Sequence, residues 1–144
     1  MGQGIFNYET KIDKEFEKVW IFFSTAENLA KITTFPKVRI LSDPSTTPGN
    51  TIKMQLNFFI FRISWHSKIT KKEQTYFIDE GEKLPFPFKE WKHTHNFKED
   101  GKLTVMTDIV EYDASVPDFF VKFMLKQMFS GREKEIKKYF QKAK

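Results

Sequence analysis

The side chains best suited to chemistry lie in one short segment, residues 90–97, which reads E-W-K-H-T-H-N-F. Side chains of a β-strand alternate between two faces, so a strand here places two imidazoles and two aromatic rings together: Trp91, His93, His95 and Phe97. The aromatic members predict that this face points into the protein. The following segment has a similar face with one carboxylate on it: Met106, Asp108, Val110 and Tyr112.

This set of side chains allows three kinds of role. Asp108 could orient His93 or His95 and raise its pKa, which would make the pair a general acid–base group. The same residues could instead contact a polar group of a ligand, or simply satisfy each other in the core. His93, His95 and Asp108 are therefore candidates for catalysis, and none is assigned a catalytic role. The H-x-H spacing offers two metal ligands without a third at a recognisable distance, so we expect no metal.

Other catalytic chemistry is excluded by composition or lacks a motif. The chain contains no Cys, which excludes disulfides, thiolate catalysis and cysteine-ligated metal centres. It has no G-x-S-x-G motif, no phosphate-binding glycine loop and no dinucleotide fingerprint. We therefore expect no cofactor, and whether the protein is an enzyme is left uncertain, leaning against.

The elements that position these residues follow from the hydrophobic pattern. We expect helices at 14–23, with Asp13 as its cap, at about 24–32, with a Ser24/Glu27 capping box, and from about 115 to the chain end. Alternation predicts strands at 5–12, 38–41, 51–61, 63–70, 74–79, 90–97 and 103–112. Consecutive strands joined by turns favour an antiparallel sheet, so the order predicts an α+β fold.

The last helix carries two departures from a simple amphipathic pattern. Its apolar stripe, centred on Leu125, contains Arg132, which must pair with a carboxylate or hold an anionic ligand group. Its first half is apolar nearly all round, because Phe119, Phe120, Phe123 and Met124 lie outside the stripe. That half is covered by the domain's own loops, forms a cavity entrance, or contacts a partner or a membrane.

Length, composition and charge describe a single small domain, residues 1–144, with 40% hydrophobic residues and 17 Phe. No apolar run is long enough to cross a membrane and the N-terminus does not resemble a secretory signal, so we expect a cytoplasmic protein without stable membrane insertion. The net charge of +5 equals the excess of the segment from Ser115 onward. We interpret this basic helix as a solvated face and expect no nucleic-acid partner. The expected oligomeric state is a monomer or a dimer.

Several motifs together resemble a known superfamily. They are W-H-S-K-I-T at 65–70, F-I-D-E at 77–80, P-F-x-x-W-x-H-x-H-x-F at 87–97, T-D-x-V-E-Y at 107–112 and F-x-x-R at 129–132. The chain resembles the SRPBCC superfamily (START-like, polyketide cyclase-like), in particular a bacterial ligand-binding branch. The loop at 80–88 departs from the family pattern, since L-P-F-P-F replaces a Gly-Pro-aromatic step.

The resemblance implies a helix-grip fold, in which a curved antiparallel sheet of about six to seven strands wraps around a long C-terminal helix, with two short helices after the first strand. It implies an internal cavity that binds a small, largely apolar molecule such as a lipid, steroid or polyketide. The expected lining residues are Trp65, Trp91, His93, His95, Met106, Asp108, Tyr112, Phe120, Phe123, Met124 and Arg132. The alternatives are a cyclase- or dehydratase-type enzyme that uses the His/Asp pair, and a protein-interaction module of the chaperone co-activator type.

Overall fold

The computed structural model describes residues 2–142 and contains, within them, seven strands and three helices. The helices are α1 (Phe16–Phe22), α2 (Ala26–Ile32) and α3 (Asp118–Lys142). The strands are β1 (Gly2–Ile12), β2 (Lys37–Ile40), β3 (Thr51–Asn57), β4 (Arg62–Lys72), β5 (Tyr76–Lys83), β6 (Phe88–Asp100) and β7 (Leu103–Ala114).

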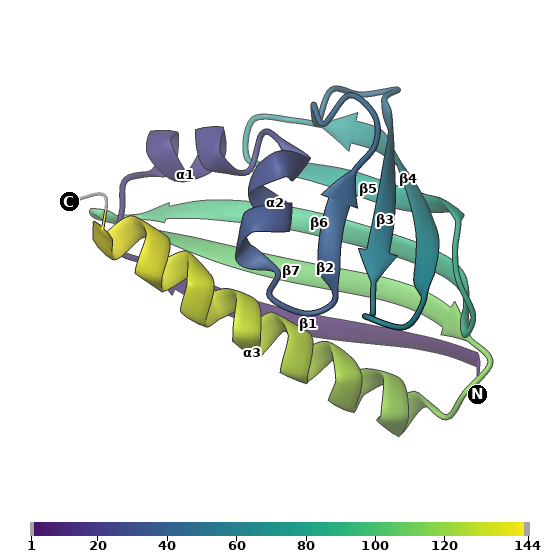
Figure 1. The fold of residues 1–144 in the computed structure, drawn as a ribbon. Coiled ribbons are helices and arrows are strands. Elements are labelled where there is room, and N and C mark those ends of the chain that lie inside the picture. The colour runs from purple at the N-terminus through teal and green to yellow at the C-terminus, as the bar shows by residue number, and fades with distance from the viewer. Residues whose placement is uncertain (1, 143–144) are drawn as a thin grey trace.

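All seven strands form one antiparallel sheet in the order β1-β7-β6-β5-β4-β3-β2. Successive hairpins connect β2 through β7, and β1 then pairs with β7. The sheet curves around the helices, and α3 runs along its inner side (Figure 1). The structure thus confirms the α+β fold, with two short helices after the first strand and one long helix at the end. No helix in the described range combines the length and the apolar character that crossing a bilayer requires.

The core consists of two apolar clusters. The first joins α1 and α2 to the far end of α3, and includes Phe22, Phe97 and Phe140. The second joins the start of α3 to β1, β6 and β7, and includes Trp91 and Phe129. The predicted stripe of α3 therefore contributes to both clusters: Val121, Leu125 and Phe129 to the second, and Ile136 and Phe140 to the first. Arg132 lies on α3 between these two sets.

Local details differ from the sequence-based expectations at the helix starts. The helix expected at 14–23 begins at Phe16, with Glu15 rather than Asp13 in the N-cap position. The next helix is capped by Thr25, whose hydroxyl accepts from the Glu27 amide, while the Ser24 hydroxyl donates to the Trp20 carbonyl. The Ser24/Glu27 capping box was thus wrong by one residue, because Ser24 still belongs to the turn that ends α1.

One strand is shorter than the sequence predicts. The expected strand at 51–61 ends at Asn57, and residues 58–61 form the turn that leads into β4. The pattern N-F-F-I-F favours a strand by propensity. The Asn57 carboxamide, however, accepts from the Phe59 amide at 2.9 Å, which stabilises the turn instead.

Candidate functional site

The strand register brings the polar residues of three neighbouring strands together. On β6, His93 and His95 both point inward and are buried. His95 lies opposite Asp108 of β7, and His93 lies opposite Asp79 of β5. The inward orientation of His93, His95 and Asp108 agrees with the alternation in the sequence.

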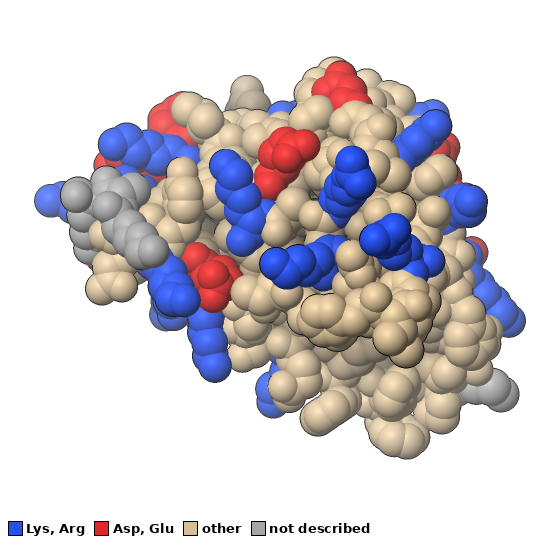
Figure 2. All heavy atoms as spheres, viewed as in Figure 1, with Lys and Arg blue, Asp and Glu red and all other residues tan. Residues whose placement is uncertain are grey.

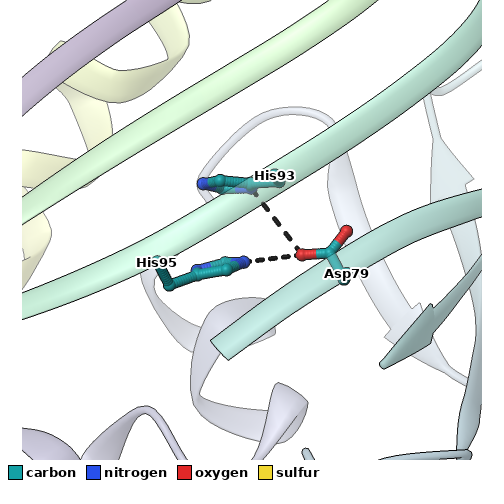
Figure 3. A group of neighbouring side chains, drawn as sticks. All are labelled: Asp79, His93 and His95. Carbon is teal, nitrogen blue, oxygen red and sulfur yellow. Dashed lines mark hydrogen bonds and ion pairs between the residues drawn. The ribbon is translucent and has the colours of Figure 1, made fainter. Parts of the chain in front are cut away.

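Two carboxylates, Asp79 and Asp108, interact with the two imidazoles, and Figure 3 shows Asp79 beside both rings. His93 Nε2 lies 2.7 Å from Asp108 Oδ1, and His95 Nε2 lies 2.6 Å from Asp79 Oδ2. The rings stack with their centroids 3.7 Å apart, and each Nδ1 lies 3.8 Å from the carboxylate that bonds the other ring. Because a carboxylate only accepts hydrogen bonds, each Nε2 carries the proton and donates it.

Burial and charge shift the pKa values of this cluster in opposite directions. Burial and the neighbouring His93 lower the pKa of His95 to about 4, so this ring is neutral at neutral pH. Burial alone would raise the pKa of Asp108, but the hydrogen bond from His93 and the charges of His93 and Arg132 hold it below its usual value. The pKa of Asp79 is lowered in the same way, through His95 and His93. Both carboxylates are therefore ionised at neutral pH.

Arg132 places a buried cation near the cluster from the side of α3. Its side chain is only 5% exposed and lies over the Phe129 ring, 4.8 Å from the centroid. Burial lowers its pKa, whereas the charges of Asp108 and Asp79 raise it. Within residues 2–142 it forms no ion pair with a carboxylate, and its Nε has no hydrogen-bond partner. The direct ion pair considered for Arg132 is thus not formed.

Aromatic side chains pack around both imidazole rings. His95 stacks on Phe77 at 4.1 Å between ring centroids. The rings of Trp91 and Phe129 lie nearly perpendicular to the His93 ring, with centroids 6.0 and 5.7 Å away. Acid–base catalysis needs an imidazole nitrogen that a substrate can reach. The packing around these rings therefore argues against catalysis by His93 or His95 in this conformation.

Sequence reasoning missed two members of this network, Asp79 and Ser67. The expected strand ended at Asp79, whereas β5 continues to Lys83, and alternation along the strand places Asp79 on the same side as the buried Phe77. The Ser67 hydroxyl is buried, accepts from Trp65 Nε1 at 2.9 Å, and helps to lower the pKa of Asp79. Phe77 and Asp79 are two residues apart on a predicted strand, so the sequence could have indicated that both side chains point inward.

The donor atoms of Asp79, His93 and His95 lie within 4.8 Å of one another, a set that could hold a metal ion. The distances between these donor atoms do not suit a metal ion. Two donors on a tetrahedral zinc ion, each about 2.1 Å from it, lie roughly 3.4 Å apart, whereas His95 Nε2 and Asp79 Oδ2 are 2.6 Å apart. The nearby Arg132 charge also opposes a cation. The arrangement therefore fits a hydrogen-bonded pair better than a metal centre.

The other expected ligand-binding residues fall into two groups. Trp91, Met106 and Tyr112 are buried in the core, and the Tyr112 hydroxyl donates to Asp118. The residues at the open side remain more accessible: Trp65, Phe120, Phe123 and Met124. At 100° per residue Phe123 lies on the side of α3 opposite to Val121, so the helix does not bring it to the sheet. Phe120 and Met124 flank the buried stripe.

An apolar surface on the inner face of β2, β3 and β4 is only half covered. The register aligns Val38, Leu56 and Ile63 in one row, and Ile40, Met54 and Trp65 in the next. All six are half-buried, whereas Ile52 and Ile69, further along the same strands, are buried. Trp65 of this surface and Met128 of α3 pack against the same cluster. Phe120 and Met124 precede Met128 by two turns and one turn, with 49% and 37% exposure. We call this region the open apolar face.

Two hollows elsewhere on the molecule have volumes of about 430 and 660 Å³. The smaller is lined by residues of β6, α1 and the turn before β5, among them Phe16 and Asn96. The larger crosses β1, β7, β6 and β5, where charged side chains such as Glu80, Lys92 and Glu111 line it. Neither lining includes a described residue of α3, so neither is the cavity expected between the sheet and this helix.

Comparison with solved structures found close matches in shape. A START superfamily protein from Mycobacterium smegmatis superposes with a TM-score of 0.76 and 8% identity over 100% of both chains. Ginseng major latex-like protein 151 from Panax ginseng has a TM-score of 0.75 and 11% identity, over 97% of this chain and 99% of its own. Norcoclaurine synthase from Thalictrum flavum, in complex with dopamine and hydroxybenzaldehyde, has a TM-score of 0.70 and 16% identity, over 99% and 88%.

No protein-family model and no curated protein matches the chain. At these identities the solved structures establish the fold, and a shared fold does not fix a shared function. The resemblance to the SRPBCC superfamily is thus confirmed at the level of architecture: the chain has the helix-grip fold of the START-superfamily proteins.

Proposed function

We propose that the protein binds a small, largely apolar molecule, without catalysis, between the open apolar face of β2–β4 and the first half of α3. The observation that carries the proposal is the set of six half-buried apolar side chains on an inner sheet surface, of which Trp65 packs against the same apolar cluster as Met128 of α3. Inner faces of a sheet are normally covered by the core, so partly covered ones mark a place for a ligand. We place the protein in the cytoplasm, as expected from the sequence.

The ligand would carry one group that accepts a hydrogen bond from Arg132. The buried Nε of Arg132 has no hydrogen-bond partner within residues 2–142. A guanidinium N–H only donates, so a hydroxyl, carbonyl or carboxylate oxygen of the ligand would satisfy it. The Nδ1 of His95 also lacks a partner there, but this ring is stacked between Phe77 and His93 and is enclosed.

A structural neighbour supports the size of such a ligand. Norcoclaurine synthase, which shares the fold, is in complex with two small aromatic molecules, dopamine and hydroxybenzaldehyde. Its identity of 16% supports no transfer of its reaction. The enclosed imidazoles speak against the cyclase- or dehydratase-type alternative, which needs a reachable His93 or His95 nitrogen.

The binding proposal can be tested with an uncharged apolar fluorophore, 1-N-phenylnaphthylamine. We expect a saturable fluorescence increase with the wild-type protein. Leu56→Gln, in the middle of the open apolar face, should weaken binding about tenfold, because one apolar contact in a pocket contributes about 1 to 3 kcal/mol. Native mass spectrometry of protein purified from its own host should show a bound molecule of low mass.

Leu41→Gln is the matched control, since Leu41 is 52% exposed and follows β2 outside the open apolar face. It should leave the affinity unchanged. Ile63→Gln, on the neighbouring strand, repeats the test should Leu56→Gln reduce stability, which thermal melts will show. Absence of saturable binding in the wild type, or equal weakening by Leu41→Gln, would contradict the proposal.

A further inference from the structure

Two loops carry an exposed group of aromatic side chains. Phe35, in the α2–β2 loop, contacts Phe58 and Phe59 of the β3–β4 turn at ring-centroid distances of 5.6 and 5.5 Å. Phe58 also stacks on Phe61 at 5.0 Å. Much of this surface is open to solvent: Phe35 is 51% exposed, Phe59 83%, Ile60 91% and Phe61 52%. We call these residues, 35 and 58–61, the aromatic tip.

The aromatic tip has a hydrogen-bonded and strained backbone. The Phe58 carbonyl accepts from the Ile60 amide at 3.0 Å, and the Phe58 amide donates to the Phe61 carbonyl at 2.9 Å. Between them Phe59 has a φ of +77°, a conformation that L-residues with bulky side chains rarely adopt. Backbone strain of this kind is concentrated at functional sites. Here it holds two large apolar side chains, Phe59 and Ile60, out in solvent.

Basic side chains flank the aromatic tip directly. Lys37, Asn57 and Arg62 are paired across the ends of β2, β3 and β4, so they form one row at the base of the tip. Arg39 is the next outward-facing residue after Lys37 on β2, and Lys53 lies further along β3. Between residues 28 and 72 the chain has eight basic residues and one acidic residue, Asp43. Acidic residues elsewhere balance this excess of positive charge, so the first 114 residues are neutral in sum.

The neighbouring surface adds apolar area to the same edge of the molecule. In the view of Figure 1, the α2–β2 loop and the β3–β4 turn lie above the first half of α3, toward the lower edge of the molecule. Phe119 and Phe123 on this half are 77% and 62% exposed. Figure 2 shows this edge almost without charged side chains, and Lys and Arg side chains gather above it, over the strands.

From this combination we propose that the aromatic tip docks on the surface of an anionic lipid membrane. Aromatic and aliphatic side chains at the tip would enter the interface between head groups and acyl chains, where such rings are favoured. Lys37, Arg39 and Arg62 would then lie at the level of the negatively charged head groups. A second copy of this chain would bring the same basic side chains close to each other, and repulsion between like charges disfavours that contact. The docking is peripheral and needs no membrane-spanning segment.

Vesicle co-sedimentation of the full chain tests this surface. We expect binding to vesicles of phosphatidylcholine with phosphatidylserine, and little binding to phosphatidylcholine alone. The double variant Phe59→Ser/Ile60→Ser should reduce binding at least tenfold, and Lys37→Ala/Arg62→Ala should reduce it on the order of tenfold, with a weaker dependence on salt. Because all four side chains belong to exposed positions, we expect these variants to fold.

Two matched controls distinguish docking through the aromatic tip from non-specific adsorption to vesicles. Ile21→Ser changes an apolar side chain that is 65% exposed on α1, outside the tip. Lys98→Ala/Lys102→Ala removes two exposed charges at the β6–β7 turn, away from the tip. Both should leave vesicle binding unchanged. Binding equal for neutral and anionic vesicles, or losses equal in controls and tip variants, would overturn the proposal. So would a dimer in light scattering that Phe59→Ser/Ile60→Ser converts to a monomer while vesicles bind neither form, since the tip would then be a self-interface.

Discussion

At the residue scale, the dominant feature is the group of ionisable side chains between the two apolar clusters: Asp79, His93, His95, Asp108 and Arg132. Removing such groups from water costs free energy that well-packed apolar side chains would not. Each hydrogen bond here joins β6 to a neighbouring strand, His93 to β7 and His95 to β5. The group therefore fixes the relative positions of three strands at the centre of the sheet, even without a catalytic role.

The shifted pKa of His95 predicts a stability that falls in mild acid. The unfolded chain binds a proton at this residue below about pH 6.5, while the folded chain binds it only near pH 4. The unfolded state thus takes up more protons between these values, and the free energy of unfolding should fall by about 3 kcal/mol from pH 7 to pH 4. Asp79 and Asp108, with lowered pKa values, contribute stability that is lost only at lower pH still.

Urea unfolding followed by circular dichroism, measured from pH 7 to pH 4, checks this prediction. His95→Gln keeps a donor for Asp79 but removes the titrating group, so its stability should change little over this range. His66→Gln is the control, because His66 is half-buried on the opposite face of β4. The interpretation fails if His95→Gln retains the wild-type slope, or if the wild type gains stability in acid.

At the scale of elements, α3 and β1 contain two glycines with opposite requirements. A methyl group on Gly131 of α3 would meet no atom within 4 Å apart from its chain neighbours and the nearby backbone of the helix itself, and the φ of Gly131 lies outside the left-handed region. A methyl group on Gly4 of β1 would overlap the Tyr112 hydroxyl and the Asp118 carboxylate, which bond to each other. The first glycine is thus a weak point of the helix, and the second is a condition of close packing between β1 and the start of α3.

We therefore expect alanine to act in opposite directions at these positions. Gly131→Ala should stabilise the protein by about 0.5 to 1 kcal/mol, since glycine in a helix interior is unfavourable by that amount. Gly4→Ala should destabilise it by about 1 to 3 kcal/mol through overpacking. Thermal and urea unfolding measure both. A loss of stability in Gly131→Ala would show that α3 needs the glycine for a reason other than space.

At the scale of the whole molecule, the two proposed binding surfaces use different residues. The open apolar face lies on the inner side of β2–β4, whereas the aromatic tip and its basic rows lie at the strand ends and on the outer side. Neither surface needs the other in order to bind.

This arrangement predicts that the two activities can be separated. Leu56→Gln should weaken fluorophore binding and leave vesicle binding unchanged. Phe59→Ser/Ile60→Ser should do the reverse. Measuring both properties on both variants distinguishes the possibilities, because a single shared surface would lose both activities together in each variant.

The sequence by itself determined the elements and their order. Alternation of apolar and polar side chains identified the strands and the inward faces of β6 and β7, and the apolar stripe identified α3 with Arg132 inside it. Gly101, whose φ is +61°, lies in the turn between β6 and β7, which connects the two strands that the sequence predicts at 90–97 and 103–112. These features depend on residues close together in the chain, which is why they can be inferred without a structure.

Only the tertiary structure decided which side chains meet. Asp79 pairs with His95 because the register of β5 against β6, next to an irregular β4–β5 pairing, brings the two side chains together. Phe59 projects into solvent because a side chain and a neighbouring carbonyl bend the end of a segment whose propensity favours a strand. Likewise, the basic rows come from three strands that are separate in sequence. Such contacts depend on register and on the curvature of the sheet, and both result from packing over the whole molecule rather than from local pattern.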